Sequence, residues 1–534
     1  MPDTFWRQPY ASQRSPVMAR NIVSTSQPLA AQAGLEVLRA GGNAVDAAVA
    51  TAAAMAVIEP VCNGLGADNF ALVWHEGKLY GLNGSGRAPR AMTIEHFAGK
   101  HQMPQLGWDP VTVPGAVSGW VALSRRFGKL PFTRLLEPAI QYASEGFPVA
   151  PLTAGMWAAA PRRYHDFPDF LHTYAPNGHT PRPGDLFANP DLARSLRLVA
   201  DSYGDAYYRG ELAQKFAAHA KATGGLFTLE DLAGHRADWV EPISVDYHGY
   251  RLHEIPPNGQ GLAALQALAI LQHRDVRSLE PDCPDVLHFG IESMKLAFAD
   301  AHRYIADPKY MDVSVEQLLD PAYIRKRAAL IDPEHAGDPK AGEPKYGGTI
   351  LLTAADANGT MVSLIQSNYQ GFGSGILIPG TGIHLQNRGA CFVLTPHHPN
   401  QIAGGKRPYH TIIPAFLTRM GADGKEEPVM AFGVMGGFMQ PQGHLQVASR
   451  FIDFHQNPQA ALDAPRWQVT TGRRVLMEPG FDSTVYEDLK RRGHELTIQP
   501  HRTITFGSGQ AILKLPDCYA AGSDQRHDGQ AVGF

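Results

Sequence analysis

The residues of this sequence best placed to do chemistry are two glycines followed by a hydroxyl residue, Gly347-Gly348-Thr349. They lie where a polar connector runs into an apolar segment. Glycine lets the backbone bend sharply, so the Thr349 hydroxyl could attack the Gly348 carbonyl with no side chain in the way. The chain would then cleave itself, and Thr349 would gain a free α-amino group of pKa about 7.7–8.0, a usable base at neutral pH. One residue would supply both nucleophile and base.

The residues after Thr349 predict a β-hairpin that positions its hydroxyl group. Gly359 takes the left-handed position of a three-residue loop, and the register that follows places Thr349 opposite Ser367, so a second hydroxyl lies beside the first. A shift of one residue would place Asn368 there instead. The alternative is a buried hairpin that begins with an ordinary threonine. The two apolar runs and the turn between them are residues 349–355, 360–366 and 356–359.

A second glycine pair, Gly436-Gly437, follows the apolar run 429–434, which is expected to form a strand. Successive glycines leave two backbone N–H groups unobstructed, which is what the oxyanion of a tetrahedral intermediate requires. The alternative is a tight turn with no chemical role. The pattern alone leaves both interpretations open.

Composition and charge favour a small-molecule partner. The 534 residues carry 47 basic and 51 acidic side chains, a formal net charge of −4, without a basic block or an acidic tail. Proteins that bind nucleic acid usually concentrate lysine and arginine on one stretch or face, so we expect no nucleic-acid partner. Length alone suggests about three or four domains, although a single large sandwich also reaches this size. Assembly into a homo-oligomer is left open.

The sequence predicts a cytoplasmic protein. Its first residues, Met1 to Arg7, lack the apolar core of a secretory signal. The longest apolar run, residues 44–58, contains Asp46 and is shorter than the ~20 residues that span a bilayer, so we expect a buried helix and no membrane partner. The cysteines have neither CxxC spacing nor the density of a disulfide framework, which is typical of a reducing compartment. They are Cys62, Cys283, Cys391 and Cys518.

The remaining chain alternates predicted helices with strand hairpins. Ser26 is expected to cap a helix that has Pro28 in its first turn. Asn43, with Asp46 three residues later, predicts the start of the next helix, and Glu59 its end. Further expected elements are a hairpin of residues 70–74 and 78–82, helices over 132–144, 190–202, 262–272 and 288–305, an exposed linker over 333–346, a loose arm over 1–20 and a surface turn over 524–529.

The segment from Thr349 to Gly375 resembles the processing site of the γ-glutamyltransferase (glutathione hydrolase) family of N-terminal-nucleophile hydrolases. The similarity extends in the family's order along nearly the whole chain, and the matching pieces together are highly specific. They are Asn43-Ala44-Val45-Asp46-Ala47-Ala48-Val49-Ala50, Val113-Pro114-Gly115, Tyr208-Arg209-Gly210, Thr228-Leu229-Glu230-Asp231-Leu232, Asn368-Tyr369-Gln370-Gly371-Phe372-Gly373-Ser374-Gly375, Arg407-Pro408 and Met435-Gly436-Gly437.

The resemblance implies an α+β protein with a four-layer αββα sandwich, built jointly by the two products of self-cleavage. These are a large fragment, residues 1–348, and a small fragment, residues 349–534. The reaction would be amide hydrolysis through an acyl-Thr349 ester, with Gly436 and Gly437 as the oxyanion hole. No metal or organic cofactor is implied, and the partners are a small-molecule substrate and the other fragment of the same precursor.

The sequence departs from the family in the expected substrate pocket. Ser85 aligns with the arginine that grips the substrate carboxylate, and Arg87 lies two residues on. Arg388 and Cys391 replace the acidic side chains that bind a substrate amino group, and neither can accept a hydrogen bond as a carboxylate does. The resemblance places six residues in the pocket: Ser85, Arg87, Tyr369, Arg388, and the pair His410-Thr411, which replaces two serines.

These departures predict the class of substrate. An arginine gives bidentate hydrogen bonds to a carboxylate and repels an ammonium group, so we expect a small carboxylate-bearing amide such as oxamate, which some family members hydrolyse to oxalate and ammonia. One alternative is a γ-glutamyl hydrolase or transferase that acts on glutathione-type compounds. A second is an inert binding protein with the same fold.

Overall fold

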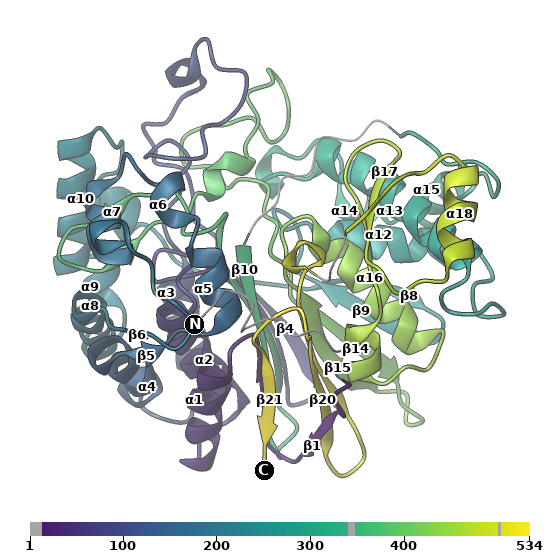
Figure 1. Cartoon of the computed structure of the whole chain (residues 1–534), viewed down its shortest axis with the longest axis horizontal. Coiled ribbons are helices and arrows are strands. Elements are labelled where there is room, and N and C mark those ends of the chain that lie inside the picture. The colour runs from purple at the N-terminus through teal and green to yellow at the C-terminus, as the bar shows by residue number, and fades with distance from the viewer. Residues whose placement is uncertain (1–12, 340–347, 500–502) are drawn as a thin grey trace.

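Two seven-stranded antiparallel sheets lie against each other at the centre of the molecule (Figure 1). The computed structural model describes residues 13–339, 348–499 and 503–534. In one sheet β10 (Gly348–Ala355) pairs with β11 (Met361–Tyr369), and both contact β15 (Glu426–Val434) of the other sheet. Helices cover the two outer faces, on the left and right of Figure 1. This arrangement confirms the predicted four-layer αββα sandwich.

The strand order is β21-β2-β10-β11-β3-β4-β7 in the sheet that contains β10 and β1-β20-β19-β15-β14-β9-β8 in the other. The remaining strands of the first sheet are β2 (Ile22–Thr25), β3 (Asp68–His75), β4 (Lys78–Asn83), β7 (Asp238–Val240) and β21 (Gln530–Gly533). Those of the second are β1 (Val17–Ala19), β8 (Ile243–Tyr247), β9 (Tyr250–Glu254), β14 (Ala415–Met420), β19 (Gly509–Lys514) and β20 (Tyr519–Ser523).

Helix α2 (Ala44–Ile58) is the central cover of the first sheet. All of its 15 residues are buried, because it lies between strands β10 and β11 on one side and helices α1 (Pro28–Arg39) and α4 (Phe132–Glu145) on the other. A capping box between Asn43 and Asp46 begins it, as predicted, and Glu59 is its C-cap. The run of alanines allows this close packing, since a small side chain lets the helix approach both neighbours.

The other long helices flank the two sheets. Those packed with α2 and α4 on the first side, or adjoining them, are α3 (Ala116–Phe127), α8 (Pro190–Asp201) and α10 (Glu211–Thr223). Those of the opposite layer are α12 (Gly261–Leu271), α13 (Pro284–Tyr304), α15 (Pro321–Ala328), α16 (Met439–Ile452) and α18 (Ser483–Arg491). No helix within the described residues is long and apolar enough to cross a membrane.

Short elements complete the chain. The short helices are α5 (Pro151–Trp157), α6 (Ala160–Arg163), α7 (Pro168–Tyr174), α9 (Asp205–Tyr208), α11 (Leu229–Ala233), α14 (Val315–Leu318) and α17 (Pro458–Asp463). The small sheets pair β5 (Phe147–Pro148) with β6 (Leu186–Phe187), β12 (Leu377–Ile378) with β13 (Ile383–His384), and β16 (Trp467–Val469) with β17 (Arg474–Met477) and β18 (Glu495–Ile498).

Three local predictions were wrong. Gln27 caps α1, whereas the Ser26 hydroxyl donates to the Glu59 carboxylate at 3.0 Å. The expected loose arm includes β1, which pairs with β20, although its first twelve residues lie outside the described part. The turn over residues 524–529 is largely buried, because Arg526 pairs inside the protein with Asp524 and with Glu478. Most of the predicted linker, residues 340–346, also lies outside the described residues.

Candidate active site

Thr349 and Ser367 face each other across the hairpin, as the sequence predicted. Ile350 pairs with Gln366 and Gly348 with Tyr369, so β11 holds one extra residue opposite Thr349. The Thr349 hydroxyl donates to Ser367 Oγ at 3.1 Å, and both side chains are buried. Such a bulge bends the strand and re-aims a side chain. The nucleophile candidate therefore lies next to Gly348 with its hydroxyl held by a second hydroxyl.

Arg388 is a charged residue that hydrogen-bonds directly to one hydroxyl of this pair. It is the first residue of a short 3₁₀ helix, η5 (Arg388–Cys391), and its side chain is fully buried. One guanidinium nitrogen donates to Ser367 Oγ at 3.2 Å and another to Thr411 Oγ1 at 2.6 Å. The guanidinium carbon lies 4.6 Å from the centre of the Tyr369 ring, a cation–π contact. Five of the predicted pocket and catalytic side chains thus meet, namely Thr349, Ser367, Tyr369, Arg388 and Thr411.

The Arg388 guanidinium keeps one unused hydrogen-bond donor inside the site. Its Nε is buried without a hydrogen-bond partner, and no carboxylate of the described part forms an ion pair with it within 4.0 Å. Asp68 interacts with this guanidinium at longer range, and an anion that contacts the guanidinium directly would further offset the cost of burying its charge. The guanidinium can therefore bind a carboxylate near the Thr349 hydroxyl, because Ser367 hydrogen-bonds to both Arg388 and Thr349.

Asp68 and His410 form a buried pair beside Arg388. The two residues approach to 3.1 Å between His410 Nε2 and Asp68 Oδ2, and the Gly115 N–H donates to the other Asp68 oxygen at 3.0 Å. Burial raises the pKa of Asp68 to about 7, although Arg388 opposes the shift. Burial also lowers the pKa of His410 well below its usual range, so the imidazole is neutral. Asp68 therefore changes charge near neutral pH.

Ser85 and Arg87, the predicted carboxylate clamp, both have partners within the protein. The Ser85 hydroxyl is buried and donates to Asn83 Oδ1 at 2.7 Å. Arg87 is 37% exposed in its side chain and pairs with Asp307 at 3.2 Å, so an acidic residue already holds its guanidinium. Buried Arg407 donates to the Ser85 carbonyl at 2.9 Å. Arg407 is thus a second buried arginine near Ser85, and it also forms an ion pair with Asp238 at 2.9 Å.

Gly436 and Gly437 lie immediately beyond β15 and adopt backbone angles that favour glycine, with φ of 124° and 62°. Neither backbone N–H has an acceptor among the residues that the structure describes. Gln260 fixes this turn against the pocket wall, because its Nε2 donates to the carbonyls of Gly437 and Thr411 at 2.8 and 2.5 Å. Two free N–H groups in a fixed turn can stabilise an oxyanion.

The sequence analysis did not assign a role in this site to three residues that lie in it. They are Asp68, Gln260 and Arg407, which come from β3, from the start of α12 and from the loop before β14. Arg407 belongs to the Arg407-Pro408 piece that resembles the family, but no role followed from it, and no local pattern marks Asp68 or Gln260. Asp68 could have been found only from the register of β3 with β11, which places it opposite Ser367.

The family model described as gamma-glutamyltranspeptidase matches residues 30–534 of the chain. Among curated proteins, the glutathione hydrolase-like YwrD proenzyme of Bacillus subtilis (strain 168) is 35% identical, covering 98% of this chain and 100% of its own. The oxamate amidohydrolase proenzyme of Klebsiella pneumoniae is 37% identical, covering 97% and 99%. Among solved structures, cephalosporin acylase from Bacillus halodurans is 50% identical with a TM-score of 0.94, covering 99% and 98%.

Proposed function

Because the chain belongs to the gamma-glutamyltranspeptidase family and is an amidohydrolase of the N-terminal-nucleophile type, we propose that it matures by self-cleavage before Thr349 and then hydrolyses a small amide bearing a carboxylate, with oxamate as the preferred substrate. The relatives named as proenzymes support a cleaved precursor. The products would be fragments 1–348 and 349–534.

Self-cleavage begins with attack of the Thr349 hydroxyl on the Gly348 carbonyl carbon. The new C–O bond replaces the peptide C–N bond, and the released nitrogen takes up a proton to become the α-amine of Thr349. Water then hydrolyses the ester, which leaves a carboxylate on Gly348 and restores the hydroxyl. Ser367 orients the attacking oxygen, because it accepts the Thr349 hydroxyl hydrogen at 3.1 Å while the Tyr369 N–H donates to it at 2.8 Å.

Catalysis uses the same oxygen with the new amine as base. The amine takes the hydroxyl proton while Thr349 Oγ1 attacks the amide carbon, and the N–H groups of Gly436 and Gly437 bind the oxyanion. The C–N bond of the amide breaks, and the nitrogen leaves as ammonia with the proton from the amine. Water attacks the resulting acyl ester, and oxalate is released when oxamate is the substrate.

The observation that carries the choice of substrate is the buried Arg388 guanidinium without a paired carboxylate. An anionic substrate would pair directly with the guanidinium through two parallel hydrogen bonds. Because Arg388 contacts Ser367 directly at 3.2 Å, a carboxylate held there favours a short acyl group such as that of oxamate. The same positive charge disfavours a substrate ammonium group at this position.

Asp68 supports a second candidate function, hydrolysis of a γ-glutamyl compound. It is a carboxylate beside Arg388 that the sequence comparison with the family did not identify, and when ionised it could accept hydrogen bonds from a substrate ammonium group. Two features weaken this candidate: Asp68 already bonds to His410 and Gly115, and its pKa of about 7 leaves it partly neutral at neutral pH.

The test is kcat/KM of the mature protein for oxamate against glutathione and γ-glutamyl-p-nitroanilide. We expect oxamate to be preferred by about 10²-fold or more, since a buried group left unpaired discriminates strongly between substrates. Asp68→Asn should preserve oxamate hydrolysis. Efficient γ-glutamyl turnover that is lost in Asp68→Asn would instead establish the second candidate and reject oxamate as the preferred substrate.

Ser367→Ala is expected to slow self-cleavage by about 10²-fold, the lower range for losing a group that assists proton transfer. The rate would be followed on denaturing gels after dilution of uncleaved precursor. Ser363→Ala is the matched control, because Ser363 is also buried on β11 but donates to the Phe432 carbonyl at 2.8 Å, away from Thr349. Equal rates for the two variants would show that Ser367 does not orient the nucleophile.

A further inference from the structure

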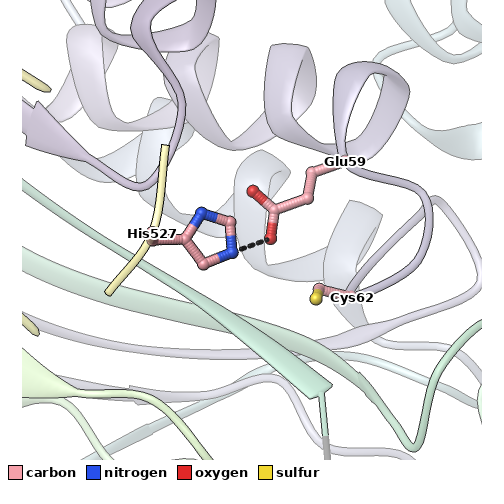
Figure 2. Close-up of side chains that lie close together, drawn as sticks. All are labelled: Glu59, Cys62 and His527. Carbon is pink, nitrogen blue, oxygen red and sulfur yellow. Dashed lines mark ion pairs between the residues drawn. The ribbon is translucent and has the colours of Figure 1, made fainter. Parts of the chain in front are cut away.

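A cluster of three buried side chains lies behind Thr349. Glu59 ends helix α2, Cys62 follows it in the next loop, and His527 comes from the buried C-terminal turn. Figure 2 shows the Glu59 carboxylate between the His527 ring and Cys62. The carboxylate and the ring approach to 3.3 Å, and all three polar atoms lie within 4.8 Å of one another. The mechanism described so far uses none of them.

This cluster is connected to the nitrogen atom of Thr349. The backbone N–H of Thr349 lies close enough to the Cys62 sulfur to affect the thiol, and the Cys62 sulfur lies within 4.8 Å of the Glu59 carboxylate. Strand β11 also contacts the loop that carries Cys62, because the Asn368 N–H donates to the Cys62 carbonyl at 3.0 Å. The order of contacts is therefore Thr349 nitrogen, Cys62 sulfur, Glu59 carboxylate, His527 ring. Self-cleavage would convert this nitrogen into the α-amine.

The charges of the cluster cancel at neutral pH. Burial opposes protonation of His527, but the Glu59 carboxylate outweighs it and raises the pKa of the ring to about 9. Burial raises the pKa of Cys62 well above its usual value, so the thiol is neutral. These three groups are also of the types that bind divalent metals, but a protonated imidazole cannot coordinate a metal. The geometry and charge therefore favour an ion pair that holds a thiol.

We propose that Cys62, held by the Glu59–His527 ion pair, positions the α-amino group of cleaved Thr349 and keeps it neutral so that it can act as the base. This inference rests on the proposed self-cleavage. Sulfur is a weak hydrogen-bond acceptor, so it orients the amine without strongly favouring the ammonium form. Glu59 alone would favour the ammonium form, and the positive His527 ring offsets its charge.

Other charged or titratable groups around this nitrogen come from several elements. Arg388 is linked to Thr349 through Ser367 and disfavours the ammonium form, whereas ionised Asp68 would favour it. The group adjoining the cluster on the C-terminal turn is Asp528, and the group that bonds to Asn368 is His384, whose pKa is lowered by burial to about 4. None of these side chains separates the Thr349 nitrogen from the Cys62 sulfur.

The test measures the pKa of the Thr349 α-amine directly. The rate of its carbamylation by cyanate is followed against pH from the mass of fragment 349–534, which requires cleavage but no substrate. We expect His527→Asn to raise this pKa by about one unit, because the Glu59 charge is then uncompensated. The acidic limb of the kcat/KM profile should move to higher pH by the same amount. The double variant Glu59→Gln/His527→Asn should return both values close to wild type.

Cys62→Ser provides the second, nearly isosteric test. A hydroxyl oxygen accepts hydrogen bonds more strongly than sulfur, so it should favour the ammonium form and also raise the amine pKa. An unchanged amine pKa in both cleaved Cys62→Ser and cleaved His527→Asn would overturn the inference while leaving the proposed function intact. A wild-type chain that never cleaves at Thr349 would overturn both.

Discussion

The Thr349→Ala variant is expected to remain a single chain of 534 residues and to lose amide hydrolysis by about 10⁶-fold. In the proposed mechanism Thr349 supplies the attacking oxygen for self-cleavage and its released nitrogen supplies the base for catalysis, so one substitution would remove both steps. Intact-mass measurement of the purified protein distinguishes the uncleaved chain from fragments 1–348 and 349–534. Ammonia release from oxamate measures the loss of activity.

Thr353→Ala is the matched control for this experiment. Thr353 is also a buried threonine on β10, and its hydroxyl has no hydrogen-bond partner in the described structure. We expect this variant to cleave and to hydrolyse amide as wild type does. A cleaved and active Thr349→Ala protein would contradict the assignment of the nucleophile, whichever substrate is used.

Arg388→Ala is expected to lower kcat/KM for oxamate by about 10³-fold or more. A site built to bind a charged group by hydrogen bonds loses several orders of magnitude when that partner is missing. Arg388→Lys keeps the charge but cannot form the two parallel hydrogen bonds of a guanidinium, so we expect only partial recovery. Oxamide, a neutral amide of similar size, separates carboxylate binding from chemistry, because its turnover should fall much less.

Arg388 also donates to Ser367, so cleavage of each variant must be checked by mass before kinetics are compared. Arg87→Ala is the comparison variant, and its loss should be about tenfold or less because Asp307 already holds this arginine. An equal fall for oxamate and oxamide in Arg388→Ala would mean that the guanidinium supports the nucleophile without recognising the substrate carboxylate. A larger loss in Arg87→Ala would move the clamp to that residue.

The hairpin that carries Thr349 could be predicted because its signals are local. The loop with Gly359 fixes the register, and the register brings Ser367 opposite Thr349. The capping box of α2 is local for the same reason. The cap of α1 was mispredicted, since Ser26 donates its hydroxyl to Glu59, a partner thirty-three residues away, and the adjacent glutamine takes its place.

The electrostatic part of the site could not be predicted in the same way. Asp68 is brought beside Arg388 by strands far apart in the sequence, and its pKa near 7 is set by burial, which no spacing of residues encodes. The C-terminal turn has the composition of an exposed loop. It is buried because Arg526 and Asp524 satisfy each other inside the protein, and this burial carries His527 to the cluster behind Thr349.

The most direct test of the account is the identity of the residue that carries the acyl group during turnover. The mature protein would be mixed with oxamate, quenched in acid within the first turnovers and digested for peptide mass mapping. We predict a mass increase of one oxalyl group on the peptide that begins at Thr349, absent from Arg388→Ala under the same conditions. An active protein with no acyl adduct at Thr349, or with an adduct on another residue, would contradict the account.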